Sequence, residues 1–211
     1  MTPHKLAVIT SATGEVLRSA NAETLIRQAL AESVGPALDK ALFSSTAASA
    51  VQPAGLLAGI APLTPASGAS GKDQLIVDDL QALTLAIAPV SGNNGVVIVA
   101  SPDAAVSLRL RVLREDVPIL VSASLAAKTV IMIATAAVAS AVEGSPAIEA
   151  TSEAAFVRDS TPQEVVTAAG TVATSLGSMW QTDQIGLKVR WSLSWGLRSS
   201  SGVAWMENVN W

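Results

Sequence analysis

Residues 21–43, NAETLIRQALAESVGPALDKALF, form the longest stretch with one periodic pattern in this chain of 211 residues. Apolar side chains recur at steps of three and four, and the polar ones fall between them, which predicts one long amphipathic helix. Asn21 suits the N-cap, where its side-chain oxygen can accept a free backbone N–H. The apolar positions are Leu25, Ile26, Ala29, Leu30, Val34, Ala37, Leu38, Ala41 and Leu42.

Gly35 and Pro36 stand in the middle of this predicted helix. A proline has no N–H for the carbonyl four residues earlier, and its ring crowds the preceding turn. The sequence therefore predicts a kink or a short break at this point.

The composition is poor in charge, with 50% hydrophobic and 14% charged residues. A freely soluble monomer usually carries more surface charge, so we expect other subunits to cover much of this chain. The net charge is −4 and the basic residues are scattered singly, which disfavours sequence-specific binding of nucleic acid. Cysteine is absent, which excludes disulfides and thiolate metal sites.

The most membrane-like segment, residues 129–142, is shorter than the roughly 20 apolar residues that span a bilayer. We interpret it as a buried strand followed by an alanine-rich turn or helix. The N-terminus shows no apolar run typical of a signal peptide, so neither export nor a membrane partner is expected.

Between the first helix and residue 142 the patterns predict a long loop and then an alternation of helices and strands. Ser101, Pro102 and Asp103 form a specific helix-start signal, because each suits a position where backbone donors are unpaired. A strand that begins at Pro118 is expected at a sheet edge. The expected elements are a strand at 5–10, a loop at 44–71, a helix from 73 to about 89 with a turn at 91–94, a strand at 96–100, a helix from 102 to about 114, strands at 118–121 and 129–133, and a small helix at 134–142.

The residue patterns in the C-terminal third of the sequence predict strands. Residues 147–159 alternate loosely and suggest a hairpin arm, whereas residues 187–198 alternate strictly and predict a strand with one apolar face. A turn at 199–202 then leads into a returning strand at 203–206. All five tryptophans lie between residues 180 and 211. Core packing is the favoured interpretation, and a subunit interface or a stacking platform for sugars or bases remains open.

No group of residues in the sequence has the composition and spacing of a catalytic, cofactor-binding or metal-binding site. His4, the one histidine, stands at the N-terminus without an evident nucleophile. Residues 68–73, GASGKD, lack the first glycine and the Ser or Thr of a phosphate-binding loop. The glycines and asparagines around residue 93 are typical of a turn. The adjacent residues Asp78 and Asp79 are typical of a solvated helix face, because neighbouring side chains on a helix point in different directions. The pair Glu115-Asp116 is typical of a loop. We therefore predict no catalytic, cofactor-binding or metal-binding residues.

Four motifs, in this order along the chain, resemble the major capsid proteins of tailed phages with the Hong Kong 97-type fold. The spine helix of that family ends in a pattern similar to residues 38–43, LDKALF, and a turn similar to residues 53–56, PAGL, follows it. Residues 96–105, VVIVASPDAA, look like the strand and helix start of the family's axial domain. Residues 181–206 are similar to its closing strand pair.

The resemblance implies an α+β fold with a long spine helix at 21–43. A peripheral domain would comprise residues 1–72 and 144–211, and an axial domain, residues 73–143, would be inserted between its two parts. Family members carry an N-terminal arm and an extended loop before the spine, so this sequence resembles the C-terminal portion of such a protein.

The function that the resemblance implies is structural, with no enzymatic activity. Copies of the chain would form the pentamers and hexamers of an icosahedral phage or prophage shell around double-stranded DNA, with only non-specific DNA contact. Portal and scaffold or protease would be further partners, and the virion, assembled in the bacterial cytoplasm, would be the location. The alternatives are an encapsulin-like or gene-transfer-particle shell and, from another class, a small α/β enzyme or ligand-binding module with loop 44–71 as its lid.

Overall fold

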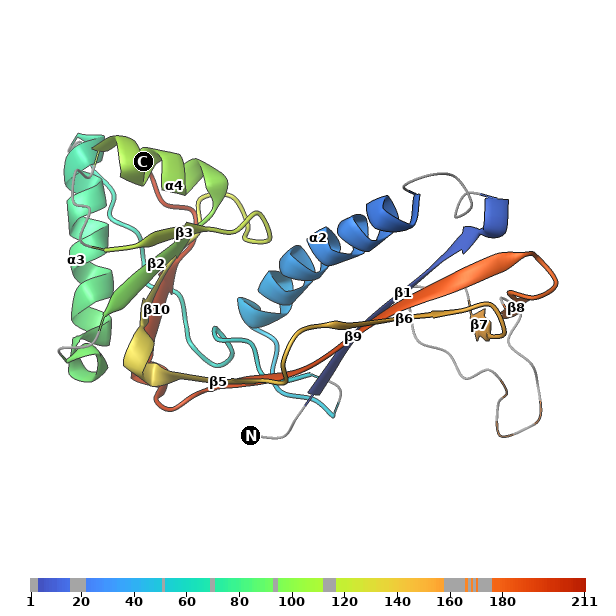
Figure 1. The fold of residues 1–211 in the computed structure, drawn as a ribbon. Helices are drawn as coiled ribbons and strands as arrows, with labels where there is room; N and C mark the ends of the chain where they lie inside the picture. The colour runs from blue at the N-terminus through green and yellow to red at the C-terminus, as the bar shows by residue number, and fades with distance from the viewer. Residues whose placement is uncertain are drawn as a thin grey trace. The chain divides into compact units, whose positions relative to one another are not determined.

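The computed structural model describes residues 4–15, 22–50, 52–68, 71–92, 95–111, 117–157, 166, 168, 170 and 176–211. The chain forms two compact units (Figure 1). Unit 1 comprises residues 1–4, 34–142 and 193–211, and unit 2 comprises residues 5–33 and 143–192. The peripheral and axial domains are defined by a subunit's place in a shell, so that division stays a prediction.

The predicted long helix is α2 (Ala22–Leu42), and it continues through Pro36. The expected short break is therefore wrong. Gly35 and Pro36 are both exposed, so the ring does not have to fit into a core. The hydroxyl of Ser124 donates to the Pro36 carbonyl at 2.9 Å, which ties this turn to the rest of unit 1. The predicted N-cap, Asn21, lies outside the described residues.

The sheet of unit 1 has the strand order β10-β4-β2-β3. Strand β3 pairs in parallel with β2, and the other neighbours are antiparallel. The prediction of an edge strand after Pro118 is confirmed, because β3 is the last strand in this order. The strands are β2 (Val96–Ala100), β3 (Ile119–Val121), β4 (Val130–Ala134) and β10 (Val203–Met206).

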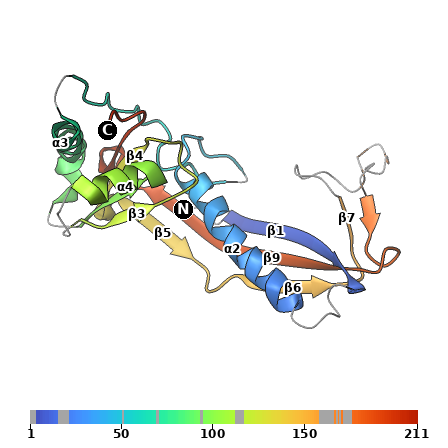
Figure 2. The ribbon, with the colours of Figure 1, turned by 90° about the horizontal axis from the view of Figure 1, so that it is seen from above.

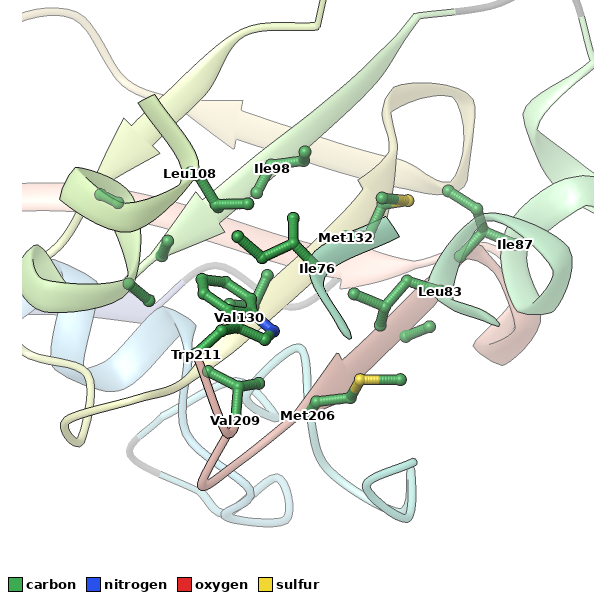
Figure 3. Packing of buried hydrophobic residues seen from close by; sticks show 14 of the residues in the cluster. Ile76, Leu83, Ile87, Ile98, Leu108, Val130, Met132, Met206, Val209 and Trp211 are labelled. Carbon is green, nitrogen blue, oxygen red and sulfur yellow. The ribbon is translucent and has the colours of Figure 1, made fainter. Parts of the chain in front are cut away.

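Two helices, α3 (Lys72–Ser91) and α4 (Pro102–Arg111), pack on one face of this sheet (Figures 1 and 2). The even-numbered side chains of β2, β4 and β10 point toward them, as the alternation of a strand requires. Figure 3 shows the resulting core, which includes Ile76, Leu83, Ile87, Ile98, Leu108, Val130, Met132, Met206, Val209 and Trp211. The sequence predicts α3 from its periodicity, α4 from its start signal at residues 101–103, and the strands β2 and β4 from continuous apolar runs.

The long loop after α2 bonds to the opposite face of the same sheet at Ile60 and then passes beside β10, where Leu63 pairs with Met206 and packs with Ala66 against the core. The indole N–H of Trp205, an odd-numbered residue of β10, donates to the carbonyl of Ile60 at 2.9 Å. Gly55 explains the PAGL turn, because its N–H donates to Thr46 and a Cβ there would collide with the Ser44 carbonyl. Only glycine fits that position.

Residues 134–142 do not form the predicted small helix. A 3-10 turn, η1 (Thr135–Ala137), leads into the strand β5 (Val138–Val142), which pairs antiparallel with residues 193–197 of β9 (Gln184–Leu197). The turn after β9 is η2 (Ser200–Gly202), as expected. However, β10 pairs with β4 and not with β9, so the two closing strands belong to different sheets.

In unit 2, β9 lies between β1 (His4–Thr13) and β6 (Ala147–Thr151) (Figure 2). The predicted strand at 5–10 is confirmed and longer than expected. The predicted hairpin arm is wrong in its pairing, because β6 pairs with β9 whereas β7 (Ala155–Val157) pairs with β8 (Leu176–Ser178). Among the described helices, none combines the length and apolarity that crossing a bilayer requires.

Candidate functional site

The polar residues that the sequence offers as candidates for catalysis or ligand binding do not form a common site in the structure. His4 begins β1, and Asp73 in the first turn of α3 forms an ion pair with Arg111 at the end of α4. Residues 69–70 of the GASGKD stretch, the asparagines at 93–94 and the acidic pair at 115–116 lie outside the described residues. Within the described part of the chain, no cluster of His, Asp or Glu side chains is arranged to hold a metal ion.

Asp79 corrects the prediction of a solvated acidic face. Its side chain is 1% exposed, and its two carboxylate oxygens accept the backbone N–H of Ala66 at 2.6 Å and the indole N–H of Trp211 at 2.8 Å. Asn210 adds a bond from its side-chain amide to the Ala66 carbonyl. The carboxylate therefore joins α3, the end of the long loop and the C-terminal residues, whereas its neighbour Asp78 is exposed as expected.

The predicted helix start of α4 is a network around Asp103. The Ser101 hydroxyl donates to the Asp103 carboxylate, and the backbone N–H groups of Ala104 and Lys128 donate as well. These bonds lower the pKa of Asp103, because they stabilise the charged form. Ser101 also accepts the N–H of Thr129 at 3.2 Å, so the start of α4 is bonded to the segment that enters β4.

Four of the five tryptophans are anchored through their indole N–H groups. Trp195 donates to the Ala54 carbonyl at 2.8 Å and Trp205 to that of Ile60, so both hold the long loop. Trp191 donates to the Gly144 carbonyl at 3.0 Å, and Trp211 donates to Asp79. Core packing is the correct interpretation for Trp195 and Trp211, which are 8% and 6% exposed. A loop bonded in this way does not fit the role of a lid.

Trp180 differs, because 76% of its surface is exposed. It lies in the turn between β8 and β9, next to a hollow of about 420 Å³ lined by Glu153, Ala154, Ala155, Ser178 and Trp180. Other large apolar side chains are exposed in unit 1, chiefly on α3, α4 and β3: Val77, Leu85, Val106, Leu110, Leu120 and Val121. These surfaces are suited to contact with other proteins.

Comparison with known proteins decides the family. The model of the Phage capsid family matches residues 1–134, more than half of the chain. The chain belongs to this phage capsid family. It is also 29% identical over 236 aligned residues to a protein named "Capsid polyprotein" from Pseudomonas phage PAJU2. That alignment covers 99% of this chain and 34% of the relative, so the chain spans about a third of that protein's length.

Solved structures agree on the fold of this capsid-family chain. The structure titled "Mycobacterium phage Bobi" matches 97% of the chain and 71% of its own, with a TM-score of 0.67 and 16% identity. A virus-like particle from Pyrococcus furiosus matches 96% of the chain and 75% of its own, with a TM-score of 0.64 and 11% identity. The expected α+β, Hong Kong 97-type fold is confirmed.

Sequence reasoning missed two residues in this capsid-family chain. Asp79 stands three residues after Ile76 and four before Leu83, so the spacing alone already placed it on the apolar stripe of α3. Trp180 precedes the strictly alternating stretch and is followed by polar residues 181–184. Trp180 therefore lies outside the predicted strand, and its polar neighbours are the sequence signal that could have indicated its exposure.

Proposed function

We propose that this chain is the structural part of a major capsid protein, which assembles with copies of itself into the icosahedral shell of a phage or prophage. Membership of the capsid family, with the Hong Kong 97-type fold over nearly the whole chain, carries this proposal. The low charge content and the exposed apolar side chains on α3, α4 and β3 support it, because contacts between subunits would cover such surfaces.

In this proposal the copies form pentamers and hexamers, with a peripheral domain of residues 1–72 and 144–211 and an axial domain of residues 73–143. The chain catalyses no reaction, and its contact with packaged double-stranded DNA is non-specific, which fits its scattered basic residues. Portal and scaffold or protease would be the other partners. Shells would assemble in the bacterial cytoplasm and remain in the virion.

Electron microscopy of the full-length product, expressed from its native locus, tests the proposal. We expect closed icosahedral shells that contain double-stranded DNA. Shells with a protein cargo or with random host DNA would instead favour the encapsulin-like or gene-transfer-particle alternative. A product that stays monomeric at high concentration would contradict every shell function.

A further inference from the structure

Hydrogen bonds hold the turn that carries Trp180, so the exposure of this side chain belongs to a formed turn of the fold. Its neighbour Met179 is 2% exposed, and the Met179 N–H donates to the Ala154 carbonyl at 3.0 Å. The Gln184 N–H donates back to Met179 at 2.9 Å, and the Thr182 hydroxyl donates to the Ser178 carbonyl at 2.9 Å. A frayed end would not have these bonds.

The chemistry of the adjacent hollow is acidic and aromatic. Glu153 contributes a carboxylate, Trp180 contributes an indole ring, and the remaining lining side chains are two alanines and a serine. Among the described residues, no basic side chain forms an ion pair with Glu153. A carboxylate and an exposed indole that line one hollow suit a cation, which the ring attracts through its quadrupole and the carboxylate through its charge.

We propose that this hollow, the Trp180 hollow, binds a lysine or arginine side chain of a neighbouring copy of the same chain. The proposal rests on the proposed shell function and names one contact within it. A second copy is the favoured occupant because the chain supplies the complementary charge: Lys188 and Arg190 are exposed on β9 of the same unit. A contact between two different patches of identical subunits can close a ring.

Energetically, the Trp180 hollow has the features of an interface hot spot. A tryptophan offers a large contact area with few rotatable bonds, and a turn that is already hydrogen-bonded has less conformational freedom to lose when a partner binds. A cation–π contact with a neighbouring carboxylate gains strength when the site is shielded from water. The contact should therefore become stronger as the shell closes and weaker as the salt concentration rises.

Fluorescence quenching by acrylamide tests whether Trp180 is covered in the shell. The signal of Trp180 is the difference between the wild-type full-length product and its Trp180→Phe variant, measured in shells and in dissociated subunits. We expect the quenching constant of this difference signal to fall at least threefold on assembly. An unchanged constant in intact shells would overturn the inference while leaving the shell function in place.

Charge reversal tests the partner's chemistry. Glu153→Lys should lower the yield of shells at least tenfold, whereas Glu143→Lys, also exposed in unit 2, serves as the matched control and should leave the yield within about twofold. Trp180→Ala should behave like Glu153→Lys, and Trp180→Phe should retain most of the yield because it keeps an aromatic face. Circular dichroism of each purified variant verifies folding.

Three outcomes would overturn the inference. Glu153→Lys could assemble like Glu143→Lys, or Trp180→Ala could assemble like the wild type. Trp180 could also stay open in shells and become protected only when an oligosaccharide or a separate protein is added, which would assign the hollow to another ligand. If the wild type forms no shells at all, the proposed function fails, and the inference fails with it.

Discussion

In unit 1, two helices and a long loop cover both faces of a four-stranded sheet, whereas in unit 2 the strands β1 and β6 flank β9 with few buried side chains. Among the described residues of unit 2, the buried apolar side chains are those of Met179, Leu187 and Val189, and β1 and β6 have none. The other buried apolar side chains for which the structure describes burial belong to unit 1. Within the described part of the chain, the buried core is therefore concentrated in unit 1, and we predict that neighbouring subunits in a shell cover unit 2.

Replacing Trp195 by alanine should be among the most destabilising changes in unit 1. The ring is buried, and its N–H bond holds the long loop at Ala54, so we expect the free energy of unfolding to fall by about 3–5 kcal/mol. Urea unfolding of the isolated subunit, followed by circular dichroism, measures this loss. A loss below about 0.5 kcal/mol would mean that Trp195 does not pack in the core.

Leucine-to-alanine changes in the two units make a matched comparison. Leu108 lies in the middle of the helix-covered core, and its loss should cost about 3–5 kcal/mol because the surrounding side chains cannot close the cavity. Leu187 of β9 is also buried but lies outside this core cluster, so we expect about 2 kcal/mol for its replacement. Equal losses of unfolding free energy for Leu108→Ala and Leu187→Ala would contradict the distinction between the two units.

Asp79→Asn tests the bond that joins α3, the loop and the C-terminal residues. The new amide group can accept only one of the two N–H donors, so the other is left buried without a partner, at a cost of about 1–3 kcal/mol. The control is Asp78→Asn, on the exposed side of the same helix, which should change stability by less than about 0.5 kcal/mol. If both variants unfold at the same urea concentration, Asp79 does not hold these segments together.

The smallest expected effect concerns the pH dependence at Asp103. Its pKa is lowered from 3.8 by the hydrogen bonds at the start of α4, so the stability that it contributes is fully present above that value. The contribution is lost as the pH falls through the lowered pKa of the folded state. Urea midpoints of wild type and Asp103→Asn should therefore differ at pH 7 and converge as the pH falls through the lowered pKa of the folded state. A constant difference across this range would contradict the account.

The elements were predictable where a local pattern decides them, and their partners were not. Periodicity predicts α2 and α3, because burial of one side of a helix recurs every three to four residues, and continuous apolar runs predict β2 and β4. The pairing of β10 with β4, and of β6 with β9, joins residues far apart in the sequence, and no local pattern specifies it. The continuity of α2 through Pro36 depends likewise on its tertiary surroundings.

The surroundings of individual polar and aromatic side chains were also only partly predictable from local patterns. The helical spacing of Asp79 places it on the apolar stripe of α3, but no local pattern identifies the N–H groups that its carboxylate binds. The partner of Asp79 is Trp211, which lies 132 residues later in the chain. Such long-range contacts decide which polar side chains leave water.

Hydrogen–deuterium exchange on isolated subunits and on assembled shells of the full-length product tests most directly whether neighbours complete unit 2. The account predicts that β2 and β4 exchange slowly in both forms, and that β1, β6 and the first half of β9 exchange quickly in the isolated subunit and at least tenfold more slowly in shells. Slow exchange of β1 and β6 in the isolated subunit, unchanged on assembly, would contradict it.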